Sequence, residues 1–341
     1  MGKTISKNIL SSIDQQIAEI RHLKKKAERS QIGGFLSHRW IKNGATILFS
    51  AISVYILINL IHTNQEAILS IQWQLNLVAL ISSISLYLLV IVIAVSIWGM
   101  MLYLFGVKVP WTHHFYAYTV APLANRLPIP LGYVGGRLVA YDKSISRKTI
   151  TYASMIEWFL LLISALILSI YPWTMSFSII VQLIIFGLLL LIGALVTPFI
   201  LHRIQIVISM GDISGKQFLK RWNLGLLLYL PVWILGGIMY FFMIQTFFPI
   251  AYSEIPQVLF IWATLGFFTM LISLLPRSFG VRAALQALLL STVLSESQSV
   301  LISVLTGIIL LGFEVVLAVV SIFIWGRGTN SYGNGTIGNE L

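Results

Sequence analysis

The stretch Leu127–Arg137, LPIPLGYVGGR, decides how this chain folds, because it interrupts a sequence that is otherwise almost continuously apolar. Its eleven residues include two prolines, three glycines and an arginine. Proline removes a backbone hydrogen-bond donor and breaks a helix, and glycine weakens one. We therefore expect the chain to turn at this point rather than to run through it as a single helix.

The composition of the whole chain is that of an integral membrane protein. Of its 341 residues, 58% are hydrophobic and only 10% are charged, and the mean hydropathy is +0.91. A chain with so few polar groups is outside the range of soluble globular domains. We expect an all-α polytopic membrane protein, because helices satisfy their own backbone hydrogen bonds in lipid. The sequence has no cysteine, which excludes disulfides, thiolate metal sites and a cysteine nucleophile.

The net charge of +11 is concentrated before the first apolar span. The cationic residues there are Lys3, Lys7, Arg21, Lys24, Lys25, Lys26, Arg29, Arg39 and Lys42. Such a cluster beside a membrane is typical of a segment that faces anionic lipid headgroups, so we do not expect nucleic acid as a partner. Within 9–26, Leu10, Ile13, Ile17 and Ile20 form an apolar stripe, which predicts a short amphipathic helix on the membrane surface.

Six apolar segments are clear transmembrane helices, since about 20 residues cross the hydrocarbon core. They are 44–62, 76–105, 150–171, 177–201, 223–248 and 298–325. Two further segments, 115–141 and 256–295, are apolar but broken, and they bring the total to as many as eight spans. We expect both to be re-entrant, although 256–275 is long enough to cross by itself and would then give a different topology.

The distribution of lysine and arginine orients the chain. The connections 63–75, 172–176 and 249–255 contain neither residue, whereas 106–114, 142–149 and 202–222 carry several. The second group and both termini should therefore be cytoplasmic, in a bacterial or archaeal cytoplasmic membrane. For these assignments to hold, 115–141 must enter from the cytoplasmic side and return to it.

The opening stretch has a counterpart later in the chain. LPIPLG at Leu127–Gly132 and LPRSFG at Leu275–Gly280 share the pattern Leu-Pro-x-x-x-Gly, and the surrounding apolar spans also match at a shift of 148 residues. Each half then crosses the membrane an odd number of times, which predicts an inverted repeat. We expect a basic segment 1–43, a membrane domain 44–325 with halves at about 44–171 and 177–325, and a polar tail 326–341.

The charged residues of these segments are the candidate site. Arg126, Arg137, Arg277 and Arg282 all belong to the broken segments, and a buried guanidinium can bind a phosphate through two parallel hydrogen bonds. They point to a site for an anionic lipid headgroup, with snorkelling to the interface as the alternative. Glu157 and Glu314 lie inside full spans, where we favour a counter-charge role over a proton or cation carrier.

Other polar residues have structural alternatives. Asn125 can contact substrate or cap a turn, and His113 and His114 are typical of an interfacial aromatic belt. The sequence contains no phosphate loop, nucleophile elbow, zinc-protease motif or aspartate cluster. We therefore expect neither catalysis nor a cofactor, and no metal-ligand spacing follows from the histidines.

The segments NRLPIPLGYVGGR, YASMIEWFLLL and LPRSFGVRAALQALLL together resemble the lysylphosphatidylglycerol synthase transmembrane-region family, a group of flippase-like membrane proteins. The resemblance covers about 44–325. It implies that the motif positions of the family are Asn125, Pro128, Gly132, Arg137, Glu157, Pro276, Gly280 and Arg282. Ala283 and Trp158 depart from the pattern, where the family often has an acid and an arginine respectively.

The resemblance implies lipid handling, and it leads us to expect a lipid translocase whose partner is a membrane lipid with an anionic headgroup. The sequence given holds no soluble aminoacyl-transferase domain, so we do not expect lysylphosphatidylglycerol as the cargo. The alternative is a membrane scaffold that binds a glycosyltransferase or lipid-modifying enzyme through the basic N-terminal helix. A membrane-embedded transferase is a third possibility, and the oligomeric state does not follow from the sequence.

Overall fold

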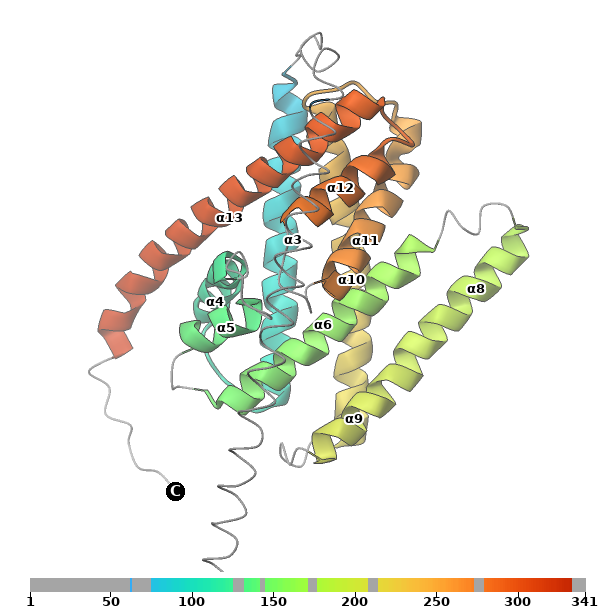
Figure 1. The fold of residues 1–341 in the computed structure, drawn as a ribbon. Coiled ribbons are helices and arrows are strands. Elements are labelled where there is room, and N and C mark those ends of the chain that lie inside the picture. The colour runs from blue at the N-terminus through green and yellow to red at the C-terminus, as the bar shows by residue number, and fades with distance from the viewer. Residues whose placement is uncertain are drawn as a thin grey trace, which may run out of the picture. The chain divides into compact units, whose positions relative to one another are not determined.

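A computed structural model of the chain describes residue 62 and residues 75–124, 132–141, 145–170, 177–207, 214–272 and 279–332. All of them belong to the second of two compact units, Met1–Phe49 and Ser50–Leu341. The described residues form helices joined by turns and loops, with no strand among them, which confirms the all-α fold (Figure 1). The predicted amphipathic helix within 9–26 and the predicted span 44–62 lie outside the described residues.

Six helices are long and apolar enough to cross a membrane, so the chain is an integral membrane protein. Five of them confirm predicted spans. The sixth, Tyr252–Leu271, falls on the segment for which the sequence allowed either a re-entrant or a crossing helix. The six helices are Leu77–Leu104, Arg147–Ser169, Ile179–Arg203, Gly215–Gln245, Tyr252–Leu271 and Glu296–Ile324.

Two of the long helices, α3 (Leu77–Leu104) and α10 (Gly215–Gln245), lie side by side and run in opposite directions (Figure 1). The N–H of Asn76, which caps α3, donates to the carbonyl oxygen of Thr246 at the end of α10, at 2.9 Å. Near the other end of the pair, Gly225 approaches Met101 so closely that a Cβ would lie 3.0 Å from the methionine methyl carbon. The start of α3 therefore meets the end of α10.

The first broken segment forms a helical hairpin of α4 (Trp111–Ala124) and α5 (Gly132–Ala140). Their 14 and 9 residues correspond to about 21 and 14 Å, well short of the roughly 30 Å hydrocarbon core. Nε2 of His113, in the first turn of α4, lies 3.2 Å from the carbonyl oxygen of Ala140, the last residue of α5. The two ends of this segment are thus together, as the re-entrant prediction requires.

The second broken segment is also a hairpin, made of α11 (Ile255–Ile272) and α12 (Phe279–Leu290). Nε2 of Gln257 donates to Oγ1 of Thr292 at 3.3 Å, which joins the start of α11 to the turn after α12. The two hairpins differ in length. With the short 3-10 helix before it, α11 forms the 20-residue stretch Tyr252–Leu271, which is long enough to cross the hydrocarbon core, whereas α4 and α5 are not.

The helix order repeats, as the sequence predicts. Shifting α4, α5 and α6 (Arg147–Ser169) by 148 residues gives 259–272, 280–288 and 295–317, which fall on α11, α12 and α13 (Glu296–Tyr332). The contacts between halves are reciprocal as well. Thr119 of α4 donates to Oγ of Ser321 of α13 at 2.8 Å, and indole Nε1 of Trp158 of α6 donates to the carbonyl of Met270 of α11 at 3.3 Å.

This arrangement is that of an inverted repeat. The hairpin α4–α5 follows the end of α3, and the hairpin α11–α12 follows the end of α10. Because α3 and α10 are antiparallel, the two hairpins open toward opposite ends of that helix pair. The reciprocal contacts follow from the same two-fold relation, since it exchanges α4 with α11 and α6 with α13.

A further apolar element begins the second half: α8 (Ile179–Leu191), a π-helical turn (Ile192–Val196) and α9 (Thr197–Val207). The wider turn at 192–196 frees backbone carbonyls, and that of Gly193 accepts a hydrogen bond of 2.7 Å from the indole of Trp222 on α10. This contact fixes the element against α10. Most of the large apolar side chains of α8 remain exposed, as expected for a helix that faces lipid.

Candidate functional site

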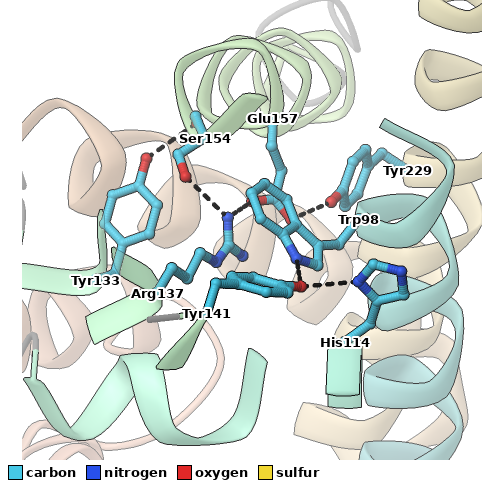
Figure 2. Close-up of polar contacts among 8 residues, drawn as sticks. All are labelled: Trp98, His114, Tyr133, Arg137, Tyr141, Ser154, Glu157 and Tyr229. Carbon is cyan, nitrogen blue, oxygen red and sulfur yellow. Dashed lines mark hydrogen bonds and ion pairs between the residues drawn. The ribbon is translucent and has the colours of Figure 1, made fainter. Parts of the chain in front are cut away.

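The centre of the first half is an ion pair between Arg137 of α5 and Glu157 of α6 (Figure 2). The two residues are only 4% and 1% exposed. Nη1 of Arg137 contacts Oε2 of the carboxylate and also lies 3.5 Å from Oγ of Ser154, one turn earlier on α6. Oε1 of the carboxylate accepts a hydrogen bond of 2.7 Å from Tyr229 of α10. In this structure Glu157 is thus the counter-charge of Arg137.

Aromatic rings surround the guanidinium. Its Cζ lies 3.8 Å from the ring centroid of Trp98, 4.9 Å from that of Tyr118 and 5.4 Å from that of Tyr133. Such contacts favour a cation through the ring quadrupole, more strongly when water is excluded. The helices α3, α4 and α5 supply these rings, so the arginine is enclosed by side chains from three elements.

A chain of hydrogen bonds holds the tryptophan in place. Indole Nε1 of Trp98 donates to the hydroxyl of Tyr141 at 2.7 Å, and that hydroxyl lies 2.7 Å from Nδ1 of His114 (Figure 2). Because the hydroxyl accepts from the indole, its own proton is available to Nδ1 of the histidine. Gly99 leaves room for this ring, since a Cβ there would lie 3.0 Å from its Cδ2 atom.

One polar atom of the cluster has no partner. Nε of Arg137 is buried and makes no hydrogen bond among the described residues. Removing an ion pair from water costs several kcal/mol, and attraction between the charges compensates only when the remaining donors and acceptors are also satisfied. A buried donor without an acceptor is uncommon in proteins and needs an explanation. The N–H at Nε is the kind of group that a phosphate oxygen could satisfy.

The second half has a neutral cluster at the equivalent place. Gln286 of α12 is 3% exposed, and its Nε2 donates to the hydroxyls of Tyr240 and Thr306 at 2.6 and 2.5 Å. Gln286 follows Arg137 by 149 residues, and Thr306 follows Glu157 by the same number. The two halves thus form the same contact between hairpin and following helix, charged in one and uncharged in the other.

The structure places only some of the predicted site residues. Gly132 is buried at the start of α5, Gly280 is the second residue of α12, and Arg282 is half-buried on α12. Arg282 is close enough to Tyr240 to interact with it electrostatically. The remaining predicted residues, Asn125, Arg126, Pro128, Pro276 and Arg277, lie outside the described residues.

The contact of Arg137 with α6 is matched in the second half by Gln286, which lies four residues or about one turn after Arg282. One sequence-based interpretation needs correction. His113 and His114 are both buried against Tyr141 rather than exposed in an interfacial belt. Their burial cannot be recognised from sequence position alone, since a helix end beside aromatic residues is typical of either environment.

Several residues of the cluster were not predicted. Trp98 and Tyr229 are fully buried in the long helices α3 and α10, and Tyr141 is fully buried directly after the short helix α5. Only the fold places the ring of Trp98 against Arg137, the hydroxyl of Tyr229 against Glu157 and the hydroxyl of Tyr141 against the indole of Trp98. No group of three or more His, Cys, Asp or Glu side chains that could hold a metal ion occurs among the described residues. No family model matches the chain, and no curated protein matches it either.

Proposed function

We propose that this protein is a lipid translocase that binds and moves an anionic or polyprenyl-linked lipid in cell-envelope lipid or glycan biosynthesis. The observation that carries the proposal is a pair of oppositely directed helical hairpins, one of which holds the buried pair Arg137 and Glu157. Interrupted helices in corresponding halves of a membrane protein are the usual location of a transport site, because their free backbone groups and charges must be satisfied there.

The chemistry of Arg137 favours an anionic headgroup. A guanidinium in the membrane costs at least about 2.5 kcal/mol and is kept where it has a function or a partner. Its planar fork binds two phosphate oxygens at once, and its Nε–H is unused among the described residues. The lipid tails would stay in the bilayer while the headgroup passes between the halves, as the flippase-like family resemblance also implies.

The proposed location is a bacterial or archaeal cytoplasmic membrane with the N-terminus in the cytoplasm. The bias of lysine and arginine among the loops supports this orientation. In the described loops, Lys108 follows α3 on one side of the repeat, while 249–255 before α11 carries no cation. The basic segment before residue 43 would then face the anionic inner leaflet.

Reconstitution into liposomes tests the proposal. A membrane-impermeant quencher reaches only the outer leaflet, so a fluorescent lipid of the inner leaflet is quenched only after it has been transferred outward. This transfer is compared for fluorescent phosphatidylglycerol and fluorescent phosphatidylcholine. We expect faster transfer of the anionic lipid, and loss of this transfer in the double variant Arg137→Gln/Glu157→Gln, which leaves no buried charge unpaired. Lys24→Gln/Lys25→Gln is the control, since it alters only surface attraction. Transfer that is equal in all three proteins and in empty vesicles would exclude a translocase and favour the scaffold alternative.

A further inference from the structure

The ion pair of the first half makes anion binding and proton binding interdependent. Glu157 is 1% exposed, and its partners are Arg137 and the hydroxyl of Tyr229. A phosphate that binds Arg137 through its free Nε and a neighbouring nitrogen draws on the same single positive charge as the carboxylate, which Nη1 contacts. Two buried anions would then share one cation, and a buried charge without a counter-charge of its own is strongly disfavoured.

We infer that binding of an anionic phosphate group at Arg137 is accompanied by the uptake of one proton by Glu157, so that anion and proton move together. This inference rests on the proposed function and names its coupling ion. Before binding, the pair carries +1 and −1. Afterwards Arg137 (+1) is neutralised by the phosphate (−1), and Glu157 is an uncharged acid whose proton comes from solvent. The buried cluster is therefore electrically neutral in both states.

The ionisable neighbours of Glu157 include one cation, Arg137 of α5, and several phenols. The phenols are those of Tyr133 from α5, Tyr118 from α4, Tyr229 from α10 and Tyr141 at the end of α5. The four tyrosines are neutral phenols at physiological pH. None of these phenols can supply a positive charge, so a proton from solvent compensates the carboxylate once the phosphate holds the arginine.

The difference between the two halves of the repeat determines how many protons accompany each anionic group. The equivalent contact in the second half joins Gln286 to Tyr240 and Thr306, and none of these three side chains is charged at neutral pH. This cluster can offer hydrogen bonds to a headgroup but cannot exchange a charge. One proton for each anionic group is therefore expected, and the coupled movement carries no net charge.

Proton uptake on binding tests the inference directly. Purified protein in a weakly buffered detergent solution is titrated with short-chain phosphatidylglycerol, while a pH-indicator dye reports the protons taken up. The phosphodiester keeps a single charge between about pH 6 and 8. The wild type should take up about one proton for each lipid bound, and its affinity should fall about tenfold for each unit of rising pH.

Three variants separate the possibilities. Glu157→Gln should bind the lipid at least as tightly as the wild type, without proton uptake and without pH dependence. The matched control Glu314→Gln, which changes another acid inside a span, should behave as the wild type. Arg137→Gln/Glu157→Gln should lose binding while it keeps a folded elution profile, because no buried charge is left unpaired.

Each contrary result has a distinct meaning. Lipid binding by the wild type with no proton uptake would overturn the coupling and leave the translocase proposal standing. Proton uptake that persists in Glu157→Gln would show that another group carries the proton. If the wild type neither binds nor transfers phosphatidylglycerol or any other anionic lipid tested, the proposed function and the coupling both fail.

Discussion

The hydroxyl of Tyr229 lies 2.7 Å from Oε1 of Glu157 and donates a hydrogen bond to it. The carboxylate is thereby held by α10 of the second half as well as by α5 of the first. This contact crosses between the two halves at the Arg137–Glu157 pair, so the geometry of the pair depends on how the halves pack against each other. Movement of one half relative to the other would change this contact.

Tyr229→Phe should destabilise the protein by about 1–2 kcal/mol, because a buried carboxylate loses one of its hydrogen-bond donors while the ring remains. The thermal unfolding midpoint in detergent, followed by tryptophan fluorescence, measures the effect. Tyr103→Phe removes a hydroxyl from an exposed side chain and serves as the control, with an expected change near zero. Equal midpoints for the two variants would contradict a structural role for the Tyr229 bond.

Arg137→Gln alone should destabilise the protein by about 3–5 kcal/mol, because it leaves Glu157 charged and buried without its partner. From the sequence alone, this substitution would be expected to weaken lipid binding without affecting folding. Because Arg137 is paired with Glu157, the substitution should lower the stability of the protein as well. Arg137→Gln/Glu157→Gln should recover most of the lost stability. Thermal unfolding of the single and double variants provides the comparison, and a double variant no more stable than the single one would exclude the pair as the cause.

Gly237→Ala should weaken the packing of α10 on α11 by about 1–3 kcal/mol, the usual cost of overpacking. A Cβ at this position would lie 2.8 Å from Cα of Leu259, and a backbone atom cannot move aside as a flexible side chain can. Close approach of two membrane helices depends on such small residues. Gly312→Ala is the matched control, since nothing lies within 4 Å of its Cβ position. A loss of stability in both variants would point to helix propensity or expression rather than packing.

Thr119→Cys/Ser321→Cys should form a disulfide under mild oxidation, because the two hydroxyl oxygens lie 2.8 Å apart. The chain has no cysteine of its own, so a mobility shift that reverses with reductant reports this bond alone. The bond would tie α4 to α13, and we expect it to stop lipid transfer until it is reduced. The pair Thr119→Cys/Ser303→Cys is the control. Cross-linking of the control pair to the same extent would argue against the contact between the halves.

Lys108→Cys and Ser253→Cys should react with a membrane-impermeant thiol reagent from opposite sides. Both side chains are exposed, that of Lys108 in the loop after α3 and that of Ser253 in the short 3-10 helix Tyr252–Glu254 before α11. The antiparallel arrangement of α3 and α10 places these two residues at opposite ends of the helix pair. The positive-inside bias predicts that Lys108→Cys reacts from the cytoplasm. Reaction of both variants from the same side would contradict the inverted repeat.

The sequence alone determined the class of the protein and the order of its helices. Spans of about 20 apolar residues have few alternatives to a transmembrane helix, and prolines with glycines mark where helices stop. For this reason five spans, the two hairpins and the repeat at 148 residues agree with the described structure. These features depend on local composition, which can be read directly from neighbouring residues.

Only the tertiary structure decided which polar atoms meet. Arg137 and Glu157 are 20 residues apart, and Tyr229 follows the glutamate by 72. The match of Arg137 with Gln286 rather than Arg282 depends on which face of α12 turns toward α13. A lipid-facing and a protein-facing side of a helix are equally apolar in a membrane, because lipid tails are as apolar as the residues of the interface. Hydrophobic periodicity therefore cannot indicate the buried face, and the packing of the helices alone does so.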